Sequence, residues 1–392
     1  MANTPGRPRW FAVGQSRSAD ARAAGAEASS AALAAHDDPR LLVVFCTDSY
    51  DLDALLAGIG ETAPGVPLIG CSTAGEIATN GPEDLSVVVM ALGGAGFSVA
   101  TSVSTGISRR LREAGAEVAG CATALAHSKH RVLMLLTDGL AGDQQEIVRG
   151  AYSVVGAEVP LVGGCAGDDL HMTRTRQMHG TRVYENAAVS AAIGSDAPMG
   201  IGVRHGWRTV GEPMLVTSSA GNRVFTLDNQ PALDVYLQRL DASAEVRTDP
   251  AAFTRFAITH PLGLSRRSGE EVRFVGEADF LDRSLGCIAE VPQGGLTWFM
   301  EGDSESVLAA TDDACNDALE ALDGQAPLGF IAFDCIARRG VLGDAGIRQE
   351  VERIGQHAMG RPVAGFYTYG EIARTSGVGG FHNQTLVVLA LS

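Results

Sequence analysis

The chain has 392 residues, of which 45% are hydrophobic and 19% are charged. This composition is sufficient for a large core, which excludes a disordered chain, and the length predicts two domains or one internally repeated domain. The formal net charge of −16 argues against nucleic-acid binding and against docking on an anionic membrane.

The N-terminal sequence MANTPGRPRWFAVG lacks the apolar core of a signal peptide, and no apolar run reaches the roughly 18 residues of a membrane span. The seven cysteines form no CxxC pair, so neither a disulfide framework nor a zinc site is predicted. We therefore expect a cytoplasmic protein without membrane insertion.

Three stretches repeat one order of elements: an apolar strand, a helix, a short strand, a glycine-rich turn and another apolar strand. Continuous apolar strands joined through helices are typical of a sheet that is covered on at least one face. The first strands are expected at 41–48, 131–138 and 328–334, the helices at 50–61, 143–157 and 344–358, and the last strands at 85–92, 187–193 and 385–391.

The glycine-rich turn carries a sequence repeat. Residues 67–77 read PLIGCSTAGEI and residues 362–372 read PVAGFYTYGEI, while residues 160–169, PLVGGCAGDD, form a looser copy. The uneven spacing of the copies indicates duplication of a supersecondary unit rather than a solenoid. The predicted fold class is α/β, with mixed sheets flanked by helices and built from repeated strand–helix–strand–turn–strand units.

A polar stretch at 241–252, DASAEVRTDPAA, interrupts this pattern. We predict two domains that meet shortly before it. The first, at 8–225, holds two repeat units, and the second, at 226–392, holds the third.

Several of these segments resemble the FIST family, over about residues 10–392. PLIGCSTAGEI, PLVGGCAGDD and FTLDNQPALDVY are similar to its N-terminal domain, and HPLGL, EEVRFV, GFIAFDCIARR, GFYTYGEIA and FHNQTLVVLAL to its C-terminal domain. The resemblance implies an intracellular sensory module of bacteria and some eukaryotes that binds small ligands, with amino acids often proposed.

The resemblance also bears on partners and cofactors. Many members carry a kinase, cyclase or methyl-accepting output domain, whereas the strand at 385–391 ends this chain. We therefore expect signalling in trans through a separate output protein such as a histidine kinase or cyclase. Some bacterial members resemble haem-based nitric oxide sensors, which is the first alternative function.

The strand ends of the third unit are the predicted ligand site, since open α/β sheets bind ligands there. Arg338 is suited to a carboxylate and Glu371 to an ammonium group, the two contacts that a zwitterionic amino acid needs. The alternative is a buried polar network that closes the C-terminal strand. The ligand-binding residues predicted in this unit are Asp334, Cys335, Arg338, Tyr367, Tyr369, Glu371, His382, Asn383 and Thr385.

The turns of the first two units add Glu76, Asp168 and Asp169 to the predicted site. Each carboxylate either accepts a ligand ammonium or bonds a nearby backbone N–H in a structural turn. We expect the three turns to converge and to border a shared hollow.

No cofactor and no metal is expected, because the histidines form no HExxH or HxH pair. A haem requires one axial histidine, for which His205, His260 and His382 are the candidates. The chain lacks GxGxxG, a Walker lysine and a GxSxG elbow, so no catalytic residue is assigned. A hydrolase or transferase that uses the same cleft is the second alternative.

Overall fold

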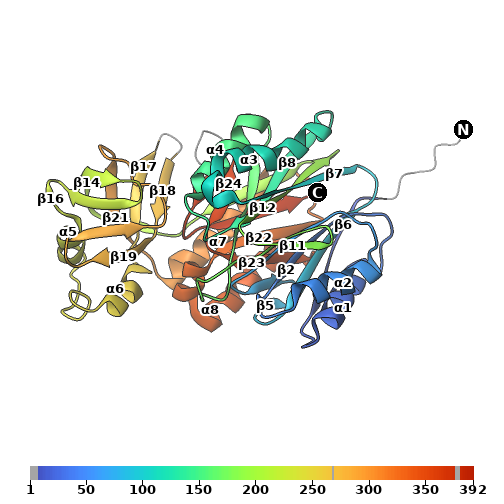
Figure 1. Cartoon of the computed structure of the whole chain (residues 1–392), viewed down its shortest axis with the longest axis horizontal. Coiled ribbons are helices and arrows are strands. Elements are labelled where there is room, and N and C mark those ends of the chain that lie inside the picture. The colour runs from blue at the N-terminus through green and yellow to red at the C-terminus, as the bar shows by residue number, and fades with distance from the viewer. Residues whose placement is uncertain (1–7, 267–268, 376–379) are drawn as a thin grey trace, which may run out of the picture.

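Three mixed sheets of six strands form the core of this computed structural model, which describes residues 8–266, 269–375 and 380–392. Helices flank the sheets, and a β-rich lobe stands at the end of the molecule far from the N-terminus (Figure 1). The predicted α/β class, with mixed sheets flanked by helices, is confirmed.

The three sheets share one strand order, because each repeat unit supplies four strands in the same sequence of neighbours. The first sheet runs β1 (Trp10–Ser16), β6 (Val87–Gly93), β2 (Pro39–Cys46), β3 (Leu68–Ser72), β10 (Gln177–His179) and β11 (Arg182–Tyr184). The second runs β7 (Phe97–Thr105), β12 (Ala187–Ser195), β8 (His130–Asp138), β9 (Leu161–Ala166), β24 (Glu371–Arg374) and β25 (Phe381–His382). The third runs β13 (Met199–Arg204), β26 (Leu386–Leu391), β22 (Gly329–Cys335), β23 (Val363–Thr368), β4 (Glu76–Ala78) and β5 (Gly81–Glu83).

The last two strands of each sheet are a hairpin that comes from a different unit. We call the glycine-rich turns at 67–77, 160–169 and 362–372 the glycine corners of the first, second and third units. After its glycine corner, the first unit contributes β4, which pairs with β23 of the third unit. The third unit sends β24 to β9 of the second, and the second sends β10 to β3 of the first. This cyclic exchange ties the three units into one body.

A pair of helices accompanies each of the first two units, and glycine lets the two helices of a pair approach closely. A Cβ on Gly58 would lie 2.0 Å from the Arg22 carbonyl oxygen, and one on Gly150 would lie 1.9 Å from that of Arg112. A side chain does not fit at either position. The pairs are α1 (Ala21–Leu33) with α2 (Leu52–Thr62), and α3 (Leu111–Ala119) with α4 (Gln144–Val155), with 3₁₀ turns at Ile107–Arg109 and Gly120–Leu125.

The third unit pairs α7 (Ser304–Glu320) with α8 (Ile336–His357). α8 is interrupted at Gly343, whose φ of 62° and ψ of −179° are not helical. Its first segment stands where the other two units have a loop after the strand, and it carries Arg338 and Arg339.

The β-rich lobe is inserted between β13 and α7. Its sheet contains eight strands, and the predicted boundary between residues 225 and 226 falls within one of them, β15. The elements of the lobe are β14 (Arg208–Ala220), β15 (Arg223–Leu227), β16 (Gln230–Pro231), α5 (Ala232–Arg239), α6 (Pro250–Ala257), β17 (Leu262–Arg266), β18 (Gly269–Arg273), β19 (Val275–Asp279), β20 (Ser284–Cys287) and β21 (Leu296–Glu301).

The central core lies between the three sheets, whose inner faces supply one apolar cluster. Phe45 of the first sheet packs against Phe366 and Phe333 of the third, with ring centroids 4.8 and 6.4 Å apart. Among the described helices, none is long and apolar enough to cross a bilayer.

Candidate functional site

The three glycine corners meet at the ends of the parallel strands, as their repetition predicts. They are joined through backbone hydrogen bonds, so each corner packs directly on the others. The contacts run from Gly167 N to Ser72 O (3.0 Å), from Tyr367 N to Gly75 O (2.8 Å) and from Cys165 N to Gly370 O (2.8 Å).

Glu76 fastens the first corner to the strand that follows it. Its buried carboxylate accepts from Thr73 Oγ1 (2.6 Å), from Ser86 Oγ (2.7 Å) and from Ser86 N (3.2 Å). Burial raises the pKa of Glu76 to about 8, against the lowering effect of these hydrogen bonds.

Glu371 makes the same set of contacts in the third corner. It accepts from the Thr368 hydroxyl, from Thr385 Oγ1 (2.9 Å) and from Thr385 N (3.1 Å). Burial raises the pKa of Glu371 to about 7. Both glutamates therefore serve the turns of their own units in this structure.

Asp168 organises the second corner together with Tyr369. The Tyr369 hydroxyl donates to Asp168 Oδ1 (2.6 Å), and backbone N–H groups of residues 172–174 donate to the same carboxylate. Burial opposes ionisation of Asp168, but these hydrogen bonds lower its pKa below the usual value. The neighbouring Asp169 is exposed and accepts from Thr47 Oγ1 (3.0 Å).

Arg338 is fully buried and is surrounded by acceptors of the protein itself. Its Nε donates to Asp334 Oδ1 (2.7 Å), and its Nη2 donates to Glu350 and to Thr311 Oγ1 (3.0 Å). Nη1 donates to the carbonyl oxygen of His205 (3.0 Å). A ligand carboxylate at Arg338 would have to displace these partners.

One guanidinium faces two carboxylates in this cluster. Burial, followed by repulsion from Glu350, raises the pKa of Asp334 well above its usual value. Within the described chain, Asp334 Oδ2, Glu350 Oε2 and the Tyr367 hydroxyl have no hydrogen-bond partner.

The remaining predicted residues of the third unit line the same buried region. His382 Nε2 lies 2.8 Å from the carbonyl oxygen of Ala373, and Asn383 and Thr385 are each 2% exposed. Burial raises the pKa of the Cys335 thiol, which disfavours a reactive thiolate. The structure thus places these residues near the C-terminal strands of the third unit, and a ligand there remains a prediction.

The three histidines that are candidate haem ligands each contact different residues. His205 Nδ1 accepts from Trp207 N (3.0 Å), and burial lowers the pKa of this histidine to about 4. His260 stacks on Phe256, with ring centroids 4.0 Å apart. His382 contacts Ala373, as described above. A haem at any of the three remains a prediction.

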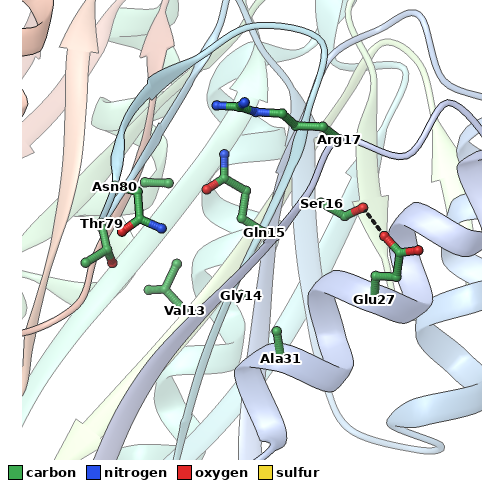
Figure 2. A pocket seen from close by; sticks show the side chains of 10 residues that line it. Val13, Gly14, Gln15, Ser16, Arg17, Glu27, Ala31, Thr79 and Asn80 are labelled. Atoms are coloured by element: carbon green, nitrogen blue, oxygen red, sulfur yellow. Dashed lines mark hydrogen bonds between the residues drawn. The ribbon is translucent and has the colours of Figure 1, made fainter.

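A hollow of about 540 Å³ lies along β1, lined also by residues of α1 and by the tip of the β4–β5 hairpin (Figure 2). Sequence reasoning did not find it, because its residues carry no motif. On one side Ser16 Oγ donates to Glu27 Oε2 (2.6 Å), and the Gln15 amide nitrogen is buried without a partner in the described chain. The lining residues are Val13, Gly14, Gln15, Ser16, Arg17, Glu27, Ala31, Ala78, Thr79 and Asn80.

Two family models match the chain: the FIST N domain at residues 40–230 and the FIST C domain at residues 232–374. The chain is also similar to an uncharacterised protein of Methanocaldococcus jannaschii, MJ1623, with 25% identity over 324 residues. That match covers 76% of this chain but only 60% of the relative. FIST domains are associated with sensory signal transduction. The two family matches cover most of the sequence, and the chain belongs to the FIST family.

Proposed function

We propose that the chain is an intracellular sensor of a small ligand, an amino acid or a related metabolite, and that it signals in trans through a separate output protein. The observation that carries this proposal is the hollow along β1. Its volume of about 540 Å³ lies in the range of small-molecule sites. Its walls offer an acid, Glu27, and an amide donor, Gln15, that has no acceptor in the described chain.

The hollow is also placed to couple ligand binding to conformation. Its walls come from β1 and α1 on one side and from residues 78–80, at the tip of the β4–β5 hairpin, on the other. That hairpin belongs to the third sheet through the pairing of β4 with β23. A ligand that touches both walls favours one arrangement of the two sheets and shifts a pre-existing equilibrium.

A thermal-shift screen of the amino acids and their simple derivatives tests the proposal. A binder at a hundredfold excess over its Kd stabilises the folded state by about 2.7 kcal/mol, which raises the midpoint measurably. Glu27→Gln should weaken that shift, whereas the matched variant Glu117→Gln in the second unit should not. The proposal is contradicted if no compound raises the midpoint, or if both variants respond as the wild type does.

A further inference from the structure

The strand registers align the three units residue by residue, starting from Gly70, Gly163 and Gly365 of the repeated turns. Counting across the ladders makes Ser16, Ser104 and Arg204 equivalent at the end of the first strand of each unit.

The packing of the helices gives the corresponding alignment of α1, α3 and α7. A Cβ on Gly25 would lie 2.2 Å from a carbonyl oxygen of α2, and one on Gly115 would lie 2.1 Å from a carbonyl oxygen of α4. Glu27 of α1 is thereby equivalent to Glu117 of α3, and the two helix N-cap residues, Asp20 and Arg110, are equivalent to each other.

In the second unit, the guanidinium of Arg110 lies between the equivalent serine and glutamate. Arg110 Nη2 donates to Glu117 Oε2 (2.9 Å) and to Ser104 Oγ (2.9 Å). These contacts, with the hydrogen bond from Arg110 first among them, lower the pKa of Glu117 to about 2. His179 Nε2 lies 3.0 Å from Thr101 Oγ1 and closes the space between the hairpin and the strand.

The third unit also places an arginine here. A Cβ on Gly202 would lie 1.8 Å from Ala314 O, just as one on Gly14 would lie 2.0 Å from Ala28 O. This aligns Asp317 of α7 with Ala31 of α1, one turn after Glu27. Arg204 Nη2 lies 2.7 Å from Asp317 Oδ2.

The first unit keeps the serine and the acid of the second unit, as Ser16 and Glu27, but lacks the side chains that fill the space between them and the hairpin. Asp20 stands where the second unit has Arg110, and Ala78 stands where it has His179. The Arg17 guanidinium pairs with Glu83 instead. Among the described residues, Glu27 therefore has the Ser16 hydroxyl as its hydrogen-bond donor and no cationic partner. The missing side chains leave the hollow.

We propose that this hollow binds a small molecule that carries a guanidinium group, and that its cation takes the place filled by Arg110 and Arg204 in the other two units. The inference rests on the proposed function and names the chemistry of its ligand. The carboxylate of Glu27 favours a cation at this end of the hollow, and a guanidinium bonds a carboxylate through two parallel N–H groups. The unpartnered amide nitrogen of Gln15 can donate to an oxygen elsewhere on the same ligand, such as the carboxylate of arginine.

Isothermal titration of the whole chain with L-arginine, agmatine and L-citrulline tests this inference. Citrulline has nearly the shape of arginine, but an uncharged ureido group stands in place of the guanidinium. We expect arginine to bind about tenfold or more tightly than citrulline, as a charge-assisted hydrogen bond predicts. Agmatine, which keeps the guanidinium but lacks the carboxylate, should also bind more tightly than citrulline.

A grafted arginine is the sharpest variant. Asp20→Arg places in the first unit the residue that the second unit uses, so it should abolish arginine binding, while Asp20→Ala should retain it. Since both variants lose the cap between Asp20 and the Ala23 N–H, they share the same effect on the helix. Glu27→Gln, which keeps the shape of the wall, should weaken arginine binding and leave the weaker binding of citrulline nearly unchanged.

The outcomes separate the two proposals. If a neutral amino acid binds the hollow more tightly than arginine, the guanidinium inference is overturned while the sensor proposal stands. If agmatine binds at Glu27 but no amino acid binds, the sensor proposal fails in its ligand class and the inference stands. If arginine and citrulline bind equally, or if Asp20→Arg binds arginine as the wild type does, the inference is wrong.

Discussion

In the third unit, Arg338 lies fully buried between Asp334 and Glu350. In the first unit, by contrast, Glu27 borders an open hollow and meets no cation in the described chain. The comparison shows that a buried arginine of the chain can supply the cation for neighbouring acids, as Arg338 does for Asp334 and Glu350. Glu27 has no cationic partner among the described residues, and in our proposal a cationic ligand takes that role.

The largest change in the free energy of unfolding should come from removing Arg338 from its buried cluster with Asp334 and Glu350. Arg338→Leu leaves Asp334 and Glu350 buried without their cation, so we expect the free energy of unfolding to fall by about 3–5 kcal/mol. Arg204→Leu is the matched control, since its ion pair is half exposed and should contribute about 1 kcal/mol or less. Chemical denaturation measures both variants, and equal losses would contradict the assigned difference in burial.

The glycine contacts between helices give the next effect. Gly58→Ala forces a methyl group against the Arg22 carbonyl oxygen, and we expect a loss of about 1–3 kcal/mol. Gly60→Ala on the same helix meets nothing within 4 Å and should stabilise α2 by about 0.5–1 kcal/mol. Thermal unfolding of both variants should therefore give shifts of opposite sign.

The corner glutamates predict a pH dependence of stability. Their pKa values in the folded chain, about 8 for Glu76 and about 7 for Glu371, lie above the unfolded value of 4.5. Since the folded state then binds more protons, their stabilising contribution is complete below pH 4.5 and is lost as pH rises toward 7 or 8. The limiting slope is about 1.4 kcal/mol per pH unit and per group.

Replacing a corner glutamate by its amide isolates this effect. Glu371→Gln cannot ionise, so its unfolding free energy should fall less steeply than that of the wild type between pH 5 and 7. Denaturation at several pH values measures the difference. Parallel pH curves for the two proteins would show that Glu371 does not titrate in this range.

The smallest change in stability should come from removing the side chains that fill the second unit's equivalent of the hollow. Arg110→Ala combined with His179→Ala removes the two side chains that fill its equivalent of the hollow. Stability should change by only about 1 kcal/mol or less, because the Arg110–Glu117 pair is exposed. We expect a second, weaker binding site for arginine in titration calorimetry. A stoichiometry unchanged from the wild type would argue against the equivalence of the two places.

The repeated turns made much of the architecture predictable. PLIGCSTAGEI and its copies indicated three α/β units and corners that converge, and both features are present. The exchange of hairpins was not predictable, because β4 and β10 have only three residues each and carry no periodicity. The inserted lobe was likewise hidden, since its strands follow β13 in the chain without a break in composition.

The site was less predictable than the fold. The sequence indicated Glu76, Glu371 and Arg338 because they lie beside strand ends, where open α/β sheets bind ligands. In the structure the chain itself provides their partners. Those of Glu76 and Glu371 are near them in sequence, whereas Arg338 also bonds Thr311 of α7 and the carbonyl oxygen of His205. The hollow depends instead on Asp20 and Ala78, which stand out only when the first unit is aligned with the second.

A crystal structure of the chain with bound arginine would show directly whether the hollow along β1 is a ligand site. We expect the guanidinium within hydrogen-bond distance of Glu27, with an acceptor oxygen of the ligand near the Gln15 amide. Density for the ligand at the third corner, beside Tyr367 and Arg338, with an empty hollow along β1, would contradict this expectation.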